Sequence, residues 1–193
     1  LHINEILNLK HVNSDIIRKK RFKIVVDGIN SSGGIIIPKL LKALNVEVKK
    51  INCIPDGNFA HDPEPLDKNL DQLKEEVLKS NSDLGIAVDP DVDRLVFVSE
   101  NGETISEENT LISCADYILS KEKGSAVSNL SSSMGLRDVC KMYGVEYFSS
   151  MVGEINVVEK MKSVNAIIGG EGNGGIIYPC LLYTSDAADD MQC

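Results

Sequence analysis

Three aspartates and an arginine follow a short apolar run near the middle of the chain. Leu84–Val88 leads into Asp89-Pro90-Asp91-Val92-Asp93-Arg94, after which Leu95–Val98 is apolar again. Because Asp89, Asp91 and Asp93 alternate along the backbone, their carboxylates can converge, and such anions repel one another unless a cation lies among them. Carboxylate oxygens suit Mg²⁺, which takes further ligands from water and phosphate. Arg94 adds a planar guanidinium group of the kind that binds phosphate.

Three alternative interpretations of this acidic stretch are open from its pattern alone. A solvated turn between two strands would carry the same residue types. An EF-hand would place Asp89, Asp91, Asp93 and Glu100 at ligand positions, but Arg94 stands where that loop requires glycine and the flanks are typical of strands. A dehalogenase-type nucleophile, here Asp89, also follows an apolar strand as Asp-x-Asp. The third aspartate followed directly by arginine favours a metal and phosphate loop.

A second candidate region is glycine-rich. Gly169–Gly175 reads Gly-Gly-Glu-Gly-Asn-Gly-Gly and precedes an apolar Ile176–Pro179. Its glycines fit the dinucleotide pattern Gly-x-Gly-x-x-Gly, but no helix follows whose N-terminus would bind a pyrophosphate, and we therefore reject a Rossmann site. Glu171 and Asn173, separated by Gly172, are suited to hydrogen bonds with sugar hydroxyls, because glycines allow close approach. A loop tip without a ligand is the alternative.

Three other loops contain polar or turn-forming residues. Gly28–Gly34 lacks the Gly-Lys-Ser/Thr of a phosphate-binding P-loop, so its pattern predicts a turn between a strand and a helix. Pro55–Pro65 is a long loop of turn-forming residues, and loops of this length are often functional. Ser131–Ser133 has no neighbouring base, which indicates a polar loop and not a nucleophile.

The elements that must position these loops alternate between strands and helices, which predicts an α/β fold of two consecutive similar domains, with mixed sheets and flanking helices. We predict the first domain at 22–105 and the second at 106–179. In the first, the expected strands are Phe22–Asp27, Glu47–Ile54, Asp83–Val88 and Leu95–Ser99, and the expected helices are Ile35–Leu44 and Leu66–Ser80. In the second, the expected strands are Ala126–Asn129, Val145–Phe148 and Asn165–Ile168, with helices at Thr110–Ser120, Gly135–Tyr143 and from near Glu154 to Lys162.

The two ends of the sequence lie outside this alternation. Residues 1–20 look helical, and we expect residues 1–21 to be the end of a preceding domain or a linker helix. Residues 180–193 continue neither domain and resemble translated sequencing-adapter DNA, so we expect a non-native tail without packed contacts. The chain does not begin with methionine, and we expect it to be incomplete.

Composition narrows the function classes. The 193 residues include 20 Lys and Arg against 29 Asp and Glu, and the net charge of −9 argues against general binding to nucleic acid or to an anionic membrane. No apolar run approaches the length of about 18 residues that marks a membrane helix, and no signal peptide is evident, so we expect a cytoplasmic location. The five cysteines are scattered, which indicates neither a zinc site nor a disulfide framework.

Taken together, the stretch from Asp89 to Arg94 and the stretch from Gly170 to Gly175 resemble the α-D-phosphohexomutase family. The resemblance includes Val25–Gly34 and His61–Pro65 and covers nearly all of the chain up to Pro179. It implies the second and most of the third of four α/β domains. It also implies an enzyme that interconverts hexose 6-phosphate and hexose 1-phosphate through a phosphoserine and a bisphosphorylated sugar.

The resemblance assigns roles to residues of both stretches. Asp89, Asp91 and Asp93 would hold Mg²⁺, Arg94 would act in catalysis by steadying the phosphate, and Glu171, Gly172 and Asn173 would bind the hexose phosphate. Asn173 stands where the family commonly has serine, and glycine follows where it has histidine, which leaves the sugar open. The chain looks most similar to phosphoglucosamine mutases, with phosphomannomutases and phosphoglucomutases as alternatives.

Two parts that the resemblance implies are not found in this sequence. A serine loop of the type Thr-Ala-Ser-His-Asn-Pro does not occur, and neither does a fourth, phosphate-gripping domain. We therefore expect the isolated chain to show no mutase turnover. A non-catalytic sugar-phosphate or metal-binding module and a dehalogenase-like phosphatase remain as alternatives from other functional classes.

Overall fold

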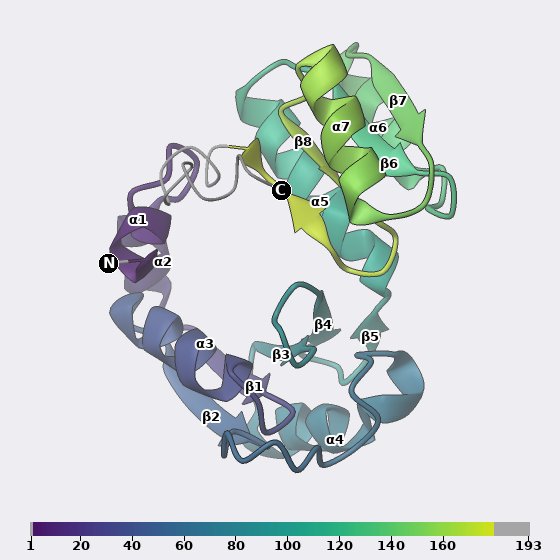
Figure 1. The fold of residues 1–193 in the computed structure, drawn as a ribbon. Coiled ribbons are helices and arrows are strands. Elements are labelled where there is room, and N and C mark those ends of the chain that lie inside the picture. Colours follow the sequence, from purple (N-terminus) through teal and green to yellow (C-terminus); the bar gives the residue numbers. More distant parts are fainter. Residues whose placement is uncertain (1, 180–193) are drawn as a thin grey trace. The chain divides into compact units, whose positions relative to one another are not determined.

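The computed structural model describes residues 2–179, which form two α/β units (Figure 1). One unit comprises Ser14–Thr110, and the other joins residues 2–13 to residues 111–179. Both units have mixed sheets with flanking helices, as predicted. Among the described residues, no helix has the length and apolar character needed to cross a membrane. The expected non-native tail, 180–193, lies outside the described residues.

The unit Ser14–Thr110 contains a five-stranded sheet in the order β2-β1-β3-β4-β5. The first three strands are parallel, and β4 and β5 are antiparallel to their neighbours. The strands are β1 (Lys23–Asp27), β2 (Glu47–Ile51), β3 (Leu84–Val88), β4 (Leu95–Ser99) and β5 (Thr104–Ile105). The helical elements are α2 (Ser14–Lys20), α3 (Gly33–Ala43), the short 3₁₀ turn η1 (Asp67–Asn69) and α4 (Asp71–Ser80).

Helices cover both faces of this sheet. Leu73 and Val77 of α4 are fully buried with Val25 and Ala87 of the central strands. On the opposite face the first turn of α3 lies against the end of β3, where a Cβ added to Gly33 would be 2.5 Å from a methyl carbon of Val88. Burial on both faces explains why the middle of β1, Ile24–Val26, and the whole of β3 are apolar without alternation. Such packing fixes the carboxyl ends of both strands, where the polar loops begin.

The second unit contains a four-stranded sheet in the order β7-β6-β8-β9, in which only β9 is antiparallel to its neighbour. Ala126 belongs to a core with Leu119 and Leu136, whereas the next residue, Val127, packs with Val157 on the other face. The sheet therefore lies between α5 and α6 on one side and α7 on the other. The strands are β6 (Ala126–Asn129), β7 (Tyr147–Ser150), β8 (Ile168–Gly170) and β9 (Ile176–Ile177), and the helices are α1 (His2–Leu7), α5 (Glu107–Lys121), α6 (Gly135–Tyr143) and α7 (Glu154–Val164).

Residues near the N-terminus pack on this second unit. The Tyr117 hydroxyl of α5 donates to the carbonyl oxygen of His11 at 2.9 Å, and Lys10 forms an ion pair with Glu122 at 2.6 Å. The predicted single helix over residues 1–20 is wrong, because α1 ends at Leu7 and a new helix begins at Ser14. Asp15 in the first turn of α2 favours that new start, since acidic side chains stabilise a helix N-terminus.

Several predicted boundaries are also wrong. The second strand ends at Ile51 and not Ile54, because Asn52 adopts a left-handed backbone with φ 47°. The third strand of the second unit begins only at Ile168, since Asn165, with φ 50°, ends α7. Asparagine tolerates this conformation better than most residues do, so Asn52 can end β2 and Asn165 can end α7. Gly169 and Gly170, predicted as loop, consequently belong to β8.

Candidate functional site

The acidic loop lies between β3 and β4, at the carboxyl end of β3. One carboxylate oxygen from each of Asp89, Asp91 and Asp93 lies within 4.8 Å of the other two, and among the described residues no other such group of potential metal ligands occurs. Asp89 is buried, with 5% of its surface exposed, whereas Asp91 and Asp93 are exposed. This arrangement offers one fixed and two accessible oxygen donors at the sheet edge where α/β proteins commonly bind ligands.

Two backbone features close the acidic loop into a tight turn. The Val92 amide donates to the carbonyl oxygen of Asp89 at 3.2 Å, and the Arg94 amide donates to Asp89 Oδ1 at 3.1 Å. Val92 has φ 67°, which is unfavourable for a β-branched residue and is maintained only where the surroundings enforce it. The turn therefore brings the alternating aspartates together at the cost of local strain.

The loop after β1 supports this turn from a distant part of the sequence. Ser31 and Ser32 donate their hydroxyls to the carbonyl oxygen of Pro90 at 2.6 and 3.0 Å. Close packing behind them requires glycine, since a Cβ on Gly34 would lie 2.7 Å from the Cα of Cys53. The sequence predicted a simple turn at Gly28–Gly34, and its contact with the acidic loop was missed because the contact depends on β1 and β3 being neighbours.

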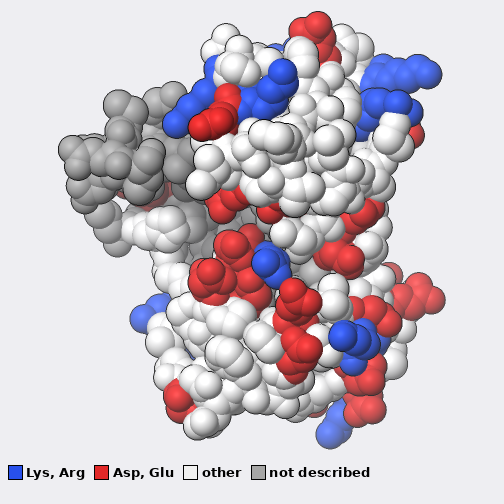
Figure 2. Space-filling view, turned by 45° about the vertical axis from the view of Figure 1, so that its right-hand side comes forward, with Lys and Arg blue, Asp and Glu red and all other residues white. Residues whose placement is uncertain are grey.

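Burial is the main reason that the pKa of Asp89 is raised, from 3.8 to about 6. A hydrogen bond that the protonated Asp89 carboxyl donates to Asp93, together with the negative charges of Asp93 and Asp91, raises the pKa of Asp89 further, whereas the Arg94 amide lowers it. In Figure 2, acidic side chains gather around one basic side chain near the middle of the drawn face, while most other basic side chains lie toward its edges. A divalent cation among the three oxygens would offset this repulsion, so the donor set fits Mg²⁺.

Arg94 is the one basic residue of the loop. Its Nη1 lies 3.5 Å from Glu64 Oε1, and its Nε lies 3.7 Å from Asp89 Oδ2 and 3.9 Å from Asp93 Oδ1. Nε is buried and has no hydrogen-bond partner within the described part of the chain. The Arg94 side chain as a whole is 33% exposed, and the accessible part of its guanidinium group is suited to an anionic acceptor such as phosphate.

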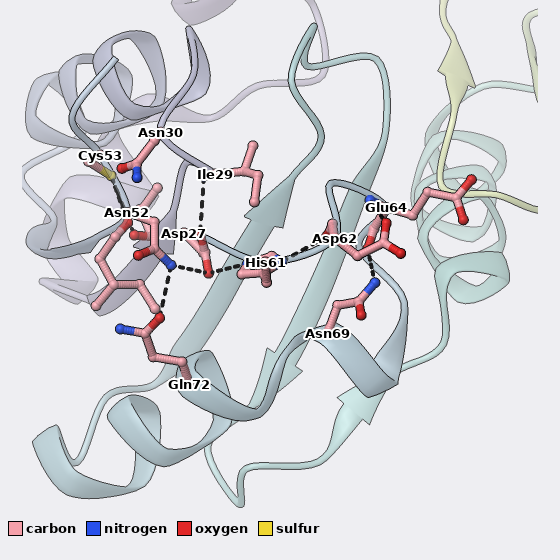
Figure 3. Close-up of polar contacts among 12 residues, drawn as sticks. Asp27, Ile29, Asn30, Asn52, Cys53, His61, Asp62, Glu64, Asn69 and Gln72 are labelled. Carbon is pink, nitrogen blue, oxygen red and sulfur yellow. Dashed lines mark hydrogen bonds and ion pairs between the residues drawn. The ribbon is translucent and has the colours of Figure 1, made fainter. Parts of the chain in front are cut away.

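A polar network centred on Asp27 includes His61, which belongs to the same loop as Glu64 (Figure 3). Asp27 ends β1 and is 2% exposed. Its Oδ1 accepts the Ile29 amide at 3.0 Å, and its Oδ2 lies 3.1 Å from both Asn52 Nδ2 and His61 Nε2. His61 Nδ1 is 2.8 Å from the carbonyl oxygen of Asp62. The network thus attaches the Pro55–Pro65 loop to the carboxyl ends of β1 and β2.

We expect Asp27→Leu to lower the free energy of unfolding by about 3–5 kcal/mol, because it leaves one buried donor, the Ile29 amide, and two partly buried donors, on Asn52 and His61, without this acceptor. Asp27→Asn should cost less, since it keeps one acceptor for Ile29 but turns an amide NH₂ toward Asn52 and His61. Urea unfolding followed by circular dichroism would measure both. Equal stability of Asp27→Leu and the unmodified chain would contradict a structural role for this network.

The second cluster lies at the turn between β8 and β9. Glu171 Oε1 accepts Asn129 Nδ2 at 2.6 Å and the Gly153 amide at 3.0 Å, while Oε2 is 3.4 Å from Asn173 Nδ2. The turn is closed by the Glu171 amide, which donates to the carbonyl oxygen of Gly175 at 3.0 Å. Glu171 and Asn173 are therefore adjacent, with Gly172 between them in the turn.

Asn129 and Gly153 were not singled out from the sequence. Asn129 ends β6, which is the parallel neighbour of β8 through the pair Ser128 and Gly170. Carboxyl ends of neighbouring parallel strands meet at one edge of a sheet, so a polar residue at the end of a predicted strand was the available indication. The backbone amide of Gly153 leaves no such indication in the sequence.

Comparison with protein families matches both units. Residues 1–102 match the model described as phosphoglucomutase/phosphomannomutase, alpha/beta/alpha domain II, and residues 106–189 match alpha/beta/alpha domain III of the same family. A phosphoglucomutase/phosphomannomutase of Thermococcus kodakarensis is 37% identical over 92% of this chain and 39% of its own length. A probable phosphoglucosamine mutase of Methanosarcina barkeri is 38% identical over 91% of this chain and 41% of its own. The chain thus spans about two fifths of these relatives.

Solved structures agree in fold. A phosphoglucomutase/phosphomannomutase family protein of Burkholderia thailandensis superimposes with a TM-score of 0.78 at 26% identity, over 88% of this chain and 39% of that one. A putative phosphomannomutase of Thermus thermophilus gives a TM-score of 0.83 at 23% identity, over 92% and 41%. With both family models matched in order along the sequence, the chain belongs to the phosphoglucomutase/phosphomannomutase family and contains its α/β/α domains II and III.

Proposed function

We propose that this chain supplies the metal loop and the sugar-binding loop of a phosphohexomutase that interconverts hexose 6-phosphate and hexose 1-phosphate. The observation that carries the proposal is the convergence of three aspartate oxygens within 4.8 Å, next to the partly exposed guanidinium group of Arg94. Family membership supports the reaction class. The phosphoryl group would be carried by a serine outside this chain, as the family resemblance implies.

Each residue of the metal loop has a role in this proposal. Asp89, Asp91 and Asp93 would hold Mg²⁺, and the bound ion would neutralise charge on the phosphoryl group during transfer. Arg94 would donate to a phosphate oxygen through the exposed part of its guanidinium group. The hydrogen bond from the Arg94 amide to Asp89 would keep the arginine next to the oxygens that bind the metal.

Glu171 and Asn173 would read the sugar. The carboxylate accepts hydrogen bonds from hydroxyls, and the Asn173 amide can both donate and accept. We propose glucosamine phosphate as the substrate, supported by relatives such as the probable phosphoglucosamine mutases of Methanosarcina barkeri and Methanopyrus kandleri. Mannose and glucose phosphates are the alternatives, supported by the relative from Thermococcus kodakarensis.

A dehalogenase-like phosphatase with Asp89 as nucleophile is less compatible with the geometry. Asp89 is buried, its Oδ1 accepts the Arg94 amide, and burial raises its pKa, whereas a nucleophilic carboxylate must be ionised and must reach the phosphorus atom. Incubation with a phosphate ester would distinguish the two, because only the phosphatase would form an aspartyl phosphate and release inorganic phosphate.

Titration of the chain with MgCl₂, and separately with glucosamine 1-phosphate, tests the proposal. We expect Mg²⁺ to raise the melting temperature of the chain and to shift backbone amide resonances of the acidic loop. The sugar phosphate should shift amide resonances of Gly172 and Asn173, and mannose 1-phosphate and glucose 1-phosphate should do so more weakly. If Mg²⁺ changed neither the melting temperature nor the spectrum, the metal role would be wrong.

A further inference from the structure

Asn129 is a buried polar residue between Glu171 and the Ser131–Ser133 loop. It is 2% exposed, and its Nδ2 donates to Glu171 Oε1 at 2.6 Å. Its Oδ1 accepts the hydroxyls of Ser131 and Ser132 at 3.0 and 2.7 Å. The orientation of the amide follows from chemistry, since an ionised carboxylate only accepts hydrogen bonds and so requires the NH₂ group on its side. The two serines then satisfy the oxygen on the other side.

The two oxygens of Glu171 have different surroundings. Oε1 accepts both Asn129 Nδ2 and the Gly153 amide, and Gly153 has φ 113°, a conformation that L-residues rarely adopt. Among residues 2–179, Oε2 has only the longer contact of 3.4 Å with Asn173 Nδ2. Two short charge-assisted hydrogen bonds on one oxygen fix the plane of the carboxylate and leave the other oxygen with unused acceptor capacity.

We infer that Asn129 is a positioning residue. Its hydrogen bond and that of the Gly153 amide occupy Glu171 Oε1, so that Oε2, beside Asn173, can accept a hydrogen bond from a sugar hydroxyl. The inference rests on the proposed role of Glu171 in sugar binding. It also gives Ser131 and Ser132 a function that the sequence did not indicate. Their hydroxyls orient the Asn129 amide, and this amide in turn orients the Glu171 carboxylate. A carboxylate fixed in advance binds a hydroxyl with a smaller loss of side-chain entropy on association.

The experiment compares three variants of the chain by NMR spectroscopy. Asn129→Asp keeps the shape but places an acceptor against Glu171, and Asn129→Leu removes both hydrogen-bonding groups without adding charge. Asn165→Asp is the matched control, because it makes the same change at an exposed position before β8, whereas Glu171 follows that strand. The readouts are the Gly153 amide resonance, the side-chain carboxyl carbon resonance of Glu171, and the affinity for glucosamine 1-phosphate. Thermal unfolding checks that each variant is folded.

We expect the Gly153 and Glu171 resonances to move in both Asn129 variants and to stay in place in Asn165→Asp. Affinity for glucosamine 1-phosphate should fall by about 10- to 100-fold in Asn129→Asp, the effect of losing a hydrogen bond to a charged group. Mg²⁺ binding at the acidic loop should be unchanged. If Asn129→Asp fails to fold, Asn129→Leu decides the same question.

The outcomes separate this inference from the proposed function. Unmoved Gly153 and Glu171 resonances in a folded Asn129 variant would overturn the positioning role, as would an unchanged affinity in Asn129→Asp when the unmodified chain binds the sugar phosphate. If the unmodified chain does not bind glucosamine, mannose or glucose 1-phosphate, the proposed sugar role of this loop fails, and with it the part of the inference that concerns Oε2. The two resonances still decide whether Asn129 positions Glu171.

Discussion

Asp89→Asn is expected to abolish the response of the chain to Mg²⁺ and, without Mg²⁺, to make the folded chain more stable at pH 7. Asp89 is the buried member of the three aspartates, so its loss removes the fixed donor around which the other two converge. Asparagine keeps an oxygen that can accept the Arg94 amide, which preserves the turn. The stabilisation follows from removal of a buried negative charge that lies close to Asp91 and Asp93.

The same substitution should change how stability depends on pH. Without metal, the pKa of Asp89 is about 6 in the folded chain, above the ordinary value of 3.8 that applies when the chain is unfolded. The folded state therefore holds this proton more tightly, and stability falls as the pH rises from about 4 to about 6, then stays level. A shift of this size corresponds to about 3 kcal/mol at most, shared with Asp93. Asp89→Asn should lack this fall.

Urea unfolding between pH 4.5 and 7.5, with and without MgCl₂, would measure both effects. Glu100→Gln is the matched control, since it removes one exposed negative charge from the same unit, just after β4. It also tests the EF-hand hypothesis, in which Glu100 would be a ligand. A normal Mg²⁺ response in Asp89→Asn, or a lost response in Glu100→Gln, would contradict the assignment of the three aspartates as the metal ligands.

The acidic loop could be predicted from the sequence because everything that defines it is local. The apolar run Leu84–Val88 predicts a buried strand, and the alternation of acids directly after it predicts convergence of their side chains. The structure shows both features. The glycine-rich turn after β8 was predicted for the same reason, although its strand begins three residues later than expected.

The contacts that support these loops could not be predicted, because each joins residues far apart in the sequence. Ser31 and Pro90 are 59 residues apart, Asn129 and Glu171 are 42 apart, and Asp27 and His61 are 34 apart. Each contact depends on which strands are neighbours, and parallel strands are joined through crossovers that leave no local pattern of pairing. The sequence therefore predicted residues that could bind a ligand. The structure shows in addition the residues whose hydrogen bonds support the ligand-binding loops.

Gly170→Ala is expected to disrupt the sugar-binding turn that follows β8. A Cβ at this position would lie 2.2 Å from the carbonyl oxygen of Gly175 and 3.1 Å from a methyl carbon of Leu111. The Gly175 oxygen cannot retreat without breaking its hydrogen bond with the Glu171 amide, which is 3.0 Å long and closes the turn. Relief of the clash must therefore displace the backbone that carries Glu171 and Asn173.

We expect Gly170→Ala to lower the free energy of unfolding by about 1–3 kcal/mol, as overpacking does, and to weaken binding of glucosamine 1-phosphate by about 100-fold, because both sugar-facing side chains lose their placement. Gly144→Ala is the matched control in the same unit: its φ of 66° makes alanine cost about 1 kcal/mol, but a Cβ there meets no atom within 4 Å. The control should bind normally. Normal sugar-phosphate binding by Gly170→Ala would show that closure of this turn is not needed to place Glu171 and Asn173.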